Sequence, residues 1–380
     1  MTWSPPAPAP ARPGPARRAS RVVGVDVARG LAVVGMFAAH LWPRDVLDER
    51  LFDGRSAILF ATLAGVGLGL LTGGARPVGR ERRPRLVAAV AVRASVLVLL
   101  GLALQVWNPW VLVILPYYGV MFVLLLPLLF APRAVVAVVG AALVVVCPWL
   151  VGLVPVDAYG STTLTGGAGL VSDALLVGSY PALVWLPFLC AGLVAARSDL
   201  RRPLVQLALV GGGALAALVG YGARLLPGAG GLAVLDPAAH EGMPAEVVGS
   251  GGVALAVLGG LLWLTDPARG RAGDGLRLAL HPLAATGAQP LTVYSAHLLL
   301  TAPLFFAAEG TGTVYGLPLG WLVASVVLTL AYATAWQRWL GRGPVERVVA
   351  LVTAPLTRPP GPVARPGEHG PVTGGPGMTG

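Results

Sequence analysis

The sequence contains no lysine and little charge of any kind. All 27 basic residues are arginines, charged residues make up 12% of the 380 positions, and the mean hydropathy is +0.76. Soluble domains carry roughly a quarter charged residues, so this composition excludes an ordinary soluble protein. The net charge of +10 does not indicate nucleic acid as a partner either, because most arginines lie in short gaps between apolar runs, as in membrane proteins.

Cysteine is equally scarce. The two cysteines, Cys147 and Cys190, both fall inside apolar runs, which excludes a disulfide framework and a cysteine metal site. His240 and Glu241 do not have the spacing of metal ligands. We therefore expect no metal cofactor.

Long apolar runs fill most of the remaining chain and predict an all-α integral membrane protein with ten transmembrane helices, since each run is near the ~20 residues that a spanning helix needs. The gap at residues 156–177 is rich in glycine, threonine and serine and is expected to be a loop. Residues 1–21 and 354–380 are rich in proline and are expected to be disordered, leaving a membrane domain of residues 22–353. The expected helices lie near residues 23–42, 56–74, 86–106, 111–131, 134–155, 178–196, 203–225, 246–265, 280–306 and 317–339.

The arginines orient these helices. With both termini in the cytoplasm, only four of the 27 arginines fall on the outer side: Arg44, Arg50, Arg55 and Arg224. Cytoplasmic loops of membrane proteins carry an excess of basic residues, so we expect this orientation. The composition is typical of a GC-rich bacterial genome, and the expected location is the inner (plasma) membrane, in contact with its lipids.

The first apolar segment, "GVDVARGLAVVGMFAAHLWP", contains three ionisable residues. At about 100° per residue, Asp26, Arg29 and His40 lie on one stripe of the helix with Val33 and Phe37. The stripe must face protein or a water-filled cavity. Asp26 and Arg29 are either a structural ion pair or part of a functional site, and His40 is either an interfacial residue beside Trp42 or a catalytic group.

Residues 280–306 repeat this pattern. Gln289 and His297 share a stripe, and Pro290 is expected to break the backbone hydrogen bonding beside Gln289. His297 is either a buried structural residue or a catalytic one. Arg93, eight residues into the third segment, either extends its charge to the interface or forms with Arg29 a cationic pocket for an anionic ligand.

Two further features are expected to lie at helix surfaces. Asp53 and Arg55, at the outer start of the second helix, are candidate substrate-binding residues. The small-residue clusters at 64–74 and 210–220 are expected to allow close helix packing, within one chain or between the chains of a homodimer.

The motif "R-x-x-G-x-D-x-x-R-G-L-A-x-x-G-M" around Asp26, Arg29 and Gly30 resembles the start of the heparan-α-glucosaminide N-acetyltransferase-like membrane proteins and of the related YeiB-like bacterial family. "DGRSAILFATLAGVGLGLL", "GAQPLTVYSAHLLL" and "GRGPVERVV" extend the resemblance, which implies about ten or eleven helices. In the acetyltransferase, acetyl-CoA from the cytoplasm supplies an acetyl group to an amino sugar on the other side. That family's catalytic histidine lies in the loop after the first helix. In this sequence that loop contains no histidine. His40 stands where that family has an asparagine.

Three functions remain open at this point. The first is an acyltransferase that moves an acyl group from cytoplasmic acyl-CoA to a small-molecule or glycan acceptor. Arg29 and Arg93 would hold the acyl-CoA. The catalytic candidates are His40, His297 and Asp26, and the candidates for binding the acceptor are Asp53, Arg55 and Gln289. The second is a transporter, to which a proline-broken helix is suited, although the two halves of the chain share no clear repeat. The third is an accessory membrane protein.

Overall fold

The computed structural model describes residues 21–42, 54–157, 161–226, 232–238, 242–309 and 317–357. Within these ranges the chain is helical, with one isolated bridge between Val156 and Thr162 in place of any strand. The ends expected to be disordered lie outside the described residues except for Arg21 and residues 354–357.

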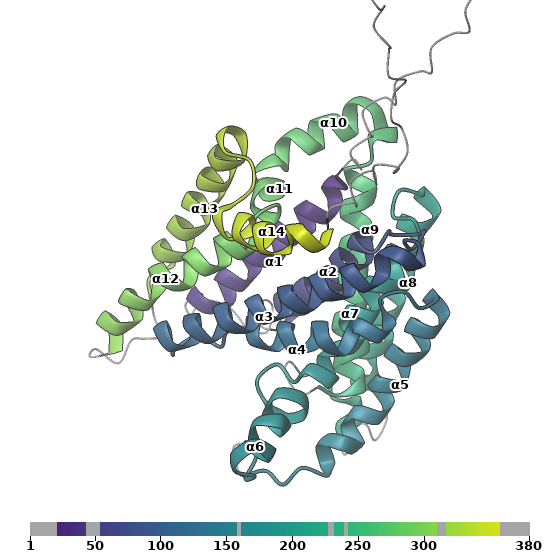
Figure 1. Ribbon diagram of the computed structural model, residues 1–380, viewed down its shortest axis with the longest axis vertical. Helices are drawn as coiled ribbons and strands as arrows, with labels where there is room; N and C mark the ends of the chain where they lie inside the picture. Colours follow the sequence, from purple (N-terminus) through teal and green to yellow (C-terminus); the bar gives the residue numbers. More distant parts are fainter. Residues whose placement is uncertain are drawn as a thin grey trace, which may run out of the picture.

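All ten predicted segments coincide with helices of the structure (Figure 1). Seven of the described helices are long and apolar enough to cross a membrane, or eight if the bent pair Gly166–Val177 and Ala182–Ala196 forms one span. The helices that correspond to the predicted segments are α1 (Val23–Leu41), α2 (Arg55–Leu71), α3 (Arg83–Trp107), α4 (Leu115–Leu125), α5 (Arg133–Gly152), α7 (Ala182–Ala196), α8 (Pro203–Gly222), α9 (Pro244–Leu264), α11 (His281–Gly287) with α12 (Pro290–Glu309), and α13 (Leu319–Trp339).

The structure corrects four details of the prediction. The segment at 156–177 is not simply a loop, because it contains α6 (Gly166–Ser172) and a π-helical turn at Asp173–Val177. The segment at 280–306 is two helices, since Pro290 begins α12 instead of continuing α11. A short polar helix, α10 (Gly270–Ala279), precedes α11, and α14 (Pro344–Thr357) extends past the expected domain boundary at residue 353.

Helix α1 lies near the centre of the fold. It packs against α2, α9, α11 and α13, while α5 and α2 pack on α7, α8 packs on α9, and α14 packs on α3 and α12 (Figure 1). The stripe of α1 that was expected to face protein does so: Val33 and Phe37 are completely buried.

The glycine clusters bring helix backbones into contact, as predicted. A Cβ atom on Gly65 of α2 would lie 2.0 Å from the carbonyl oxygen of Leu189 in α7, and one on Gly213 of α8 would lie 2.6 Å from that of Gly252 in α9. These distances leave no room for a side chain, so α2 with α7 and α8 with α9 form closely packed pairs.

A buried arginine at the end of α7 joins three other segments. The guanidinium of Arg197 donates to the carbonyl oxygens of Gly69 (3.3 Å) and Gly74 (2.5 Å), to Thr72 Oγ1 (2.8 Å) and to the carbonyl oxygen of Leu129. Carbonyl oxygens in the last turn of α2, just after α2 and after α4 thereby accept from a charged donor. Hydrogen bonds from a charged donor are among the strong ones.

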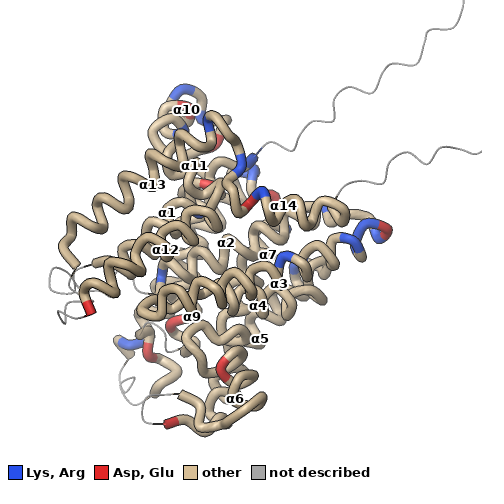
Figure 2. Tube along the Cα trace, turned by 60° about the vertical axis from the view of Figure 1, so that its left-hand side comes forward, with Lys and Arg blue, Asp and Glu red and all other residues tan. Residues whose placement is uncertain are grey.

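Most of the described basic residues lie toward one end of the molecule. Figure 2 shows them around α10, near α14 and at the start of α3, with few near α6. We call this the arginine end, and the opposite end, where α2 begins with Arg55 and α8 is followed by Arg224, the far end. Ten crossings and a cytoplasmic arginine end both stay predictions.

Candidate functional site

Two histidines from distant parts of the sequence meet toward the far end. His40, in the last turn of α1, and His297, in α12, place Nδ1 and Nε2 3.2 Å apart, which is hydrogen-bond distance. The sequence marked both residues as candidates, but gave no indication that they touch. His40 and His297, which were predicted as separate candidates, therefore lie in one site.

Neighbouring aromatic rings hold the pair in place. The ring of Phe37, one turn before His40, stacks on His297 with 3.8 Å between centroids and 10° between planes. Tyr294, one turn before His297 in α12, lies 6.5 Å from the His40 ring. His297 is only 4% exposed, whereas His40 is partly exposed. The accessible member of the pair is thus His40.

The hydrogen bond between the rings restricts their protonation. Two neutral imidazoles can bond only if one nitrogen donates its N–H and the other accepts with a lone pair. When His40 Nδ1 donates to His297 Nε2, the lone pair of His40 lies on Nε2, which can then accept a proton as a general base. His297 then fixes the tautomer and orientation of His40, the part that a carboxylate plays in other histidine sites.

Asn108, which the sequence did not single out, braces α12 beside His297. Its Nδ2 donates to the carbonyl oxygen of Leu298 (3.0 Å) and to Thr301 Oγ1 (3.2 Å), and the hydroxyl of Thr301 donates to the carbonyl oxygen of His297 (2.8 Å). A single asparagine at the end of an apolar helix gives no sequence signal for this role, because its partners lie some 190 residues away in the chain.

A second site lies at the arginine end. Arg29 and Arg93, predicted to share an anion pocket, line one cavity of about 510 Å³ together with Arg21. Mostly apolar residues of α2, α3 and α4, among them Phe60, Leu97 and Phe122, form much of its wall, and the start of α12 and Glu346 of α14 complete it. We call it the arginine cavity. A cavity lined by arginines and by apolar residues fits a ligand with an anionic part and a less polar extension.

The arginines of this cavity are only partly neutralised. Arg29 Nη1 forms an ion pair with Asp26 Oδ1 at 3.1 Å, which confirms that these two residues pair. Arg93 makes no hydrogen bond within the described residues, and its Nε is buried without a partner. A buried guanidinium without an acceptor is costly, and an anion in the cavity would supply one.

Among the described residues, one acidic side chain lies on the cavity wall, and it is already engaged. Glu346 of α14 accepts hydrogen bonds from the backbone N–H groups of Leu291 (2.7 Å) and Thr292 (3.1 Å), and from Thr292 Oγ1 (2.5 Å). It therefore caps the start of α12, where a helix leaves N–H groups unpaired and favours a negative charge. The sequence did not identify this residue.

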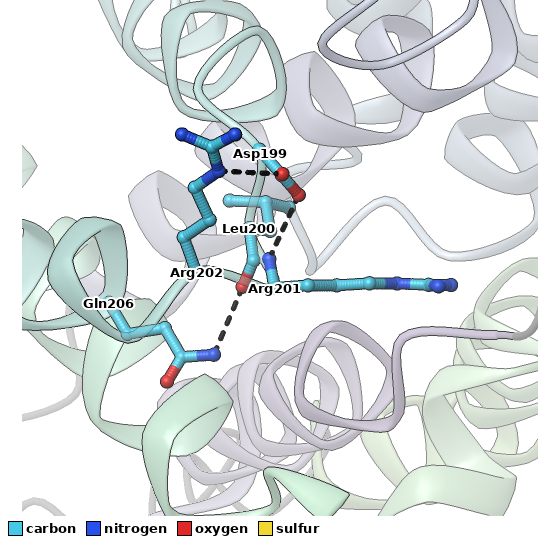
Figure 3. Close-up of polar contacts among 5 residues, drawn as sticks. All are labelled: Asp199, Leu200, Arg201, Arg202 and Gln206. Atoms are coloured by element: carbon cyan, nitrogen blue, oxygen red, sulfur yellow. Dashed lines mark hydrogen bonds and ion pairs between the residues drawn. The ribbon is translucent and has the colours of Figure 1, made fainter. Parts of the chain in front are cut away.

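A smaller cavity of about 310 Å³ adjoins the first and shares Arg21 and Arg29 with it. Asp26, Asp199 and Arg201 complete its polar lining. In the turn between α7 and α8, the Asp199 carboxylate accepts from the backbone N–H of Arg201 (3.4 Å) and from Arg202 Nε (3.2 Å). The side chains of Arg201 and Arg202 point in different directions from this turn (Figure 3).

Gln206 ties this turn to the end of α9. Its Nε2 donates to the carbonyl oxygen of Leu200 (3.1 Å; Figure 3) and to Asp266 Oδ2 (2.9 Å). The backbone N–H of Ala268 and, after it, the Gln206 amide lower the pKa of Asp266 below its usual range. Asp266 therefore stays ionised at neutral pH and keeps the α8 and α9 ends joined.

The remaining candidate residues do not join either site. Gln289 is buried and donates to the carbonyl oxygen of Ala333 in α13 (2.9 Å). Arg55 donates from Nε to Tyr221 Oη at 3.2 Å, at the far end, and Tyr221 Oη lies 2.8 Å from Ser250 Oγ. Asp53, His240 and Glu241 lie outside the described residues. Among the residues that are described, no group of three or more His, Cys, Asp or Glu side chains is placed to hold a metal ion.

Comparison with known proteins does not assign the chain to a family. No protein-family model matches the chain, and no curated protein matches it.

Proposed function

We propose that the protein is a membrane-embedded acyltransferase that takes an acyl group from acyl-CoA at the arginine end and gives it to an acceptor near the far end. The hydrogen bond between His40 and His297 carries the proposal, because it supplies an oriented base inside a bundle of apolar helices. The arginine cavity supports it, since phosphates of the donor would neutralise Arg29 and Arg93. The resemblance of the first helix to the acetyltransferase family points to the same chemistry.

The chemistry follows from the tautomer that leaves a lone pair on His40 Nε2. This nitrogen removes a proton from an acceptor hydroxyl or amine while the acceptor atom attacks the thioester carbon. The carbon–sulfur bond then breaks, and the departing thiolate takes the proton from the His40 imidazolium. In the second possible route, Nε2 attacks the thioester carbon, and the carbon–sulfur bond breaks to release the CoA thiolate. The acceptor then displaces the acyl group from Nε2, and the acceptor's proton goes to the thiolate. His297 orients the ring in both routes, and Arg55 lies on the side where the acceptor would bind.

The test uses the purified full chain in proteoliposomes, with acetyl-CoA or palmitoyl-CoA outside and glucosamine inside. Mass spectrometry measures acylated glucosamine, and a thiol assay measures released CoA. We expect transfer by the unchanged protein, and a loss of about 10²–10⁴-fold in His40→Ala, the range that general base catalysis contributes. His297→Ala should lower kcat with little change in KM, because His297 positions the base and does not bind the donor.

His281→Ala is the matched control, since this histidine begins α11 away from the pair. Normal membrane insertion and elution volume of each variant exclude misfolding as the cause. Full transfer activity in His40→Ala would contradict the proposed role of His40. Accumulation of labelled glucosamine without any acyl-CoA would instead support a transporter, for which the break between α11 and α12 is the supporting observation.

A further inference from the structure

One cavity of the described chain has no part in the proposed transfer. It measures about 620 Å³ and lies between α5 and α8, with α7 and α9 behind it. Alanine, valine, leucine and glycine supply nearly all of its wall, including Ala137 and Ala141 of α5 and Ala208 and Leu209 of α8. We call it the lateral groove, because α5 and α8 are among the spanning helices with the smallest buried fraction and so present most of their surface to the membrane.

The groove runs along much of the bundle. Its lining runs from Arg133 to Val144 on α5 and from Leu204 to Ala216 on α8, which covers about 17 Å at 1.5 Å per residue. On α9 the lining continues to Val247 and Val248, one turn from the start of that helix. Gly220, near the end of α8, packs against Gly249 of α9, so these valines lie near the far end. The groove therefore extends from the arginine end past the ~15 Å of one leaflet.

Charge occurs at one end of the groove only. Arg133, the first residue of α5, is exposed at the arginine end and makes no hydrogen bond or ion pair with any other described residue. The nearby hydroxyl of Ser198 donates to the carbonyl oxygen of Val194 (2.9 Å) and is the other polar group of the lining at this end. A cation at one end of an apolar groove matches the chemistry of an anionic lipid.

We propose that the lateral groove binds one acyl chain of an anionic glycerophospholipid whose phosphate pairs with Arg133. The charge of Arg133 selects an anionic lipid over an apolar helix of a second copy, because it is, among the described residues, the one charged residue in a lining that is otherwise almost entirely apolar. The single cation selects an anionic head group over a zwitterionic one. An unfilled apolar void of this size would forfeit the packing contacts that close-packed interiors have, so the lipid also contributes to the stability of the α5–α8 side.

Native mass spectrometry of the purified chain tests the proposal. The protein is titrated with phosphatidylglycerol and with phosphatidylcholine that carry identical acyl chains. We expect one retained phosphatidylglycerol, bound about tenfold more tightly than phosphatidylcholine, since a charge-assisted pair is worth on the order of this factor. Arg133→Gln should remove the preference, whereas Arg85→Gln, which removes another exposed arginine from the same end, should leave it unchanged.

Two variants fill the groove and one controls for added bulk. Ala141→Trp and Ala208→Trp should each abolish retention of the lipid, while Val138→Trp, on a face of α5 outside the lining, should not. The unchanged protein in vesicles that contain a photoreactive phosphatidylglycerol should be crosslinked in α5 or α8. Retention in both groove-filling variants, equal binding of the two lipids, or crosslinks confined to other helices would overturn the proposal. A dimer that Ala141→Trp separates, with no retained lipid, would show that a second copy fills the groove.

Discussion

Arg93 is the residue whose environment most directly indicates a bound anion. It lies eight residues into the third predicted segment, faces the arginine cavity and keeps its Nε buried without a partner. Arg29, on the same cavity, already has a carboxylate at 3.1 Å. Of the two, Arg93 therefore has the greater need of an added acceptor.

We expect Arg93→Gln to raise the KM for acetyl-CoA about 10- to 100-fold, because a hydrogen bond to a charged group is worth about 1.5–3 kcal/mol. The kcat should change little, since Arg93 does not reach the histidines. Steady-state kinetics in proteoliposomes measure both constants. Arg85→Gln, an exposed arginine of the same helix, should leave both unchanged. If Arg93→Gln lowered kcat and left KM unchanged, the result would contradict binding of acyl-CoA in the arginine cavity.

Individual candidate residues could be read from the sequence, but their partners could not. The helical wheel placed Asp26 and Arg29 one turn apart, and the structure confirms their ion pair. His40 and His297 are 257 positions apart, so only the packing of α1 on α11 and α12 brings them together. Glu346 and Arg197 were missed for the same reason, because their partners are backbone groups of other helices.

At the scale of helices, the crossing of α1 and α11 determines where Arg29 points. A Cβ atom on Gly30 would lie 2.0 Å from the carbonyl oxygen of Leu283, and one on Gly287 would lie 1.8 Å from that of Asp26. The two backbones therefore touch at a pair of glycines, directly beside the Asp26–Arg29 ion pair. Any larger residue must separate the helices at the wall of the arginine cavity.

Gly287→Ala should accordingly lower the apparent Tm by several degrees, because overpacking a close contact costs about 1–3 kcal/mol. Gly211→Ala in α8 is the matched control: no atom lies within 4 Å of its added methyl group, and alanine favours a helix over glycine by up to ~1 kcal/mol. Its apparent Tm should stay equal or rise. Size-exclusion chromatography after heating measures both. An unchanged Tm in Gly287→Ala would show that α1 and α11 are not held this closely.

Helix positions were predictable wherever hydropathy alone decides them, which is why all ten segments coincide with helices. The errors fall where another principle applies. Pro290 separates α11 from α12 because a proline in a helix interior removes a backbone hydrogen bond. Helices α10 and α14 are short and carry arginines, so no apolar run marks them. The folding of such short helices depends on contacts with other helices, such as the hydrogen bonds between Glu346 of α14 and the start of α12.

At the scale of the whole molecule, the distribution of arginines predicts the orientation in the membrane. Arg85 and Arg271 belong to the arginine end, whereas Leu164 and Leu225 belong to segments predicted to lie outside. The native cysteines, Cys147 and Cys190, are buried. Single introduced cysteines can therefore report the two faces without interference.

A membrane-impermeant maleimide added to intact bacterial cells should label Leu164→Cys and Leu225→Cys, but not Arg85→Cys or Arg271→Cys. Inside-out vesicles should give the reverse pattern, because basic segments stay in the cytoplasm. Labelling of all four from the same side would contradict ten crossings. The reverse labelling of the two pairs would contradict the proposed donor side, because acyl-CoA is a cytoplasmic compound.

Under the proposed function, the length of α1 sets a length requirement on the acyl donor. Arg29 and His40 lie on one uninterrupted helix, 11 residues or about 17 Å apart along its axis. A donor whose phosphates rest on Arg29 must therefore extend its reactive carbon by roughly this distance to meet His40. Acyl phosphates and acyl adenylates have that carbon directly beside the phosphate and are too short. Coenzyme A has a long flexible arm between its phosphates and its sulfur, so under the proposed function the length of α1 would favour it over shorter activated acyl compounds.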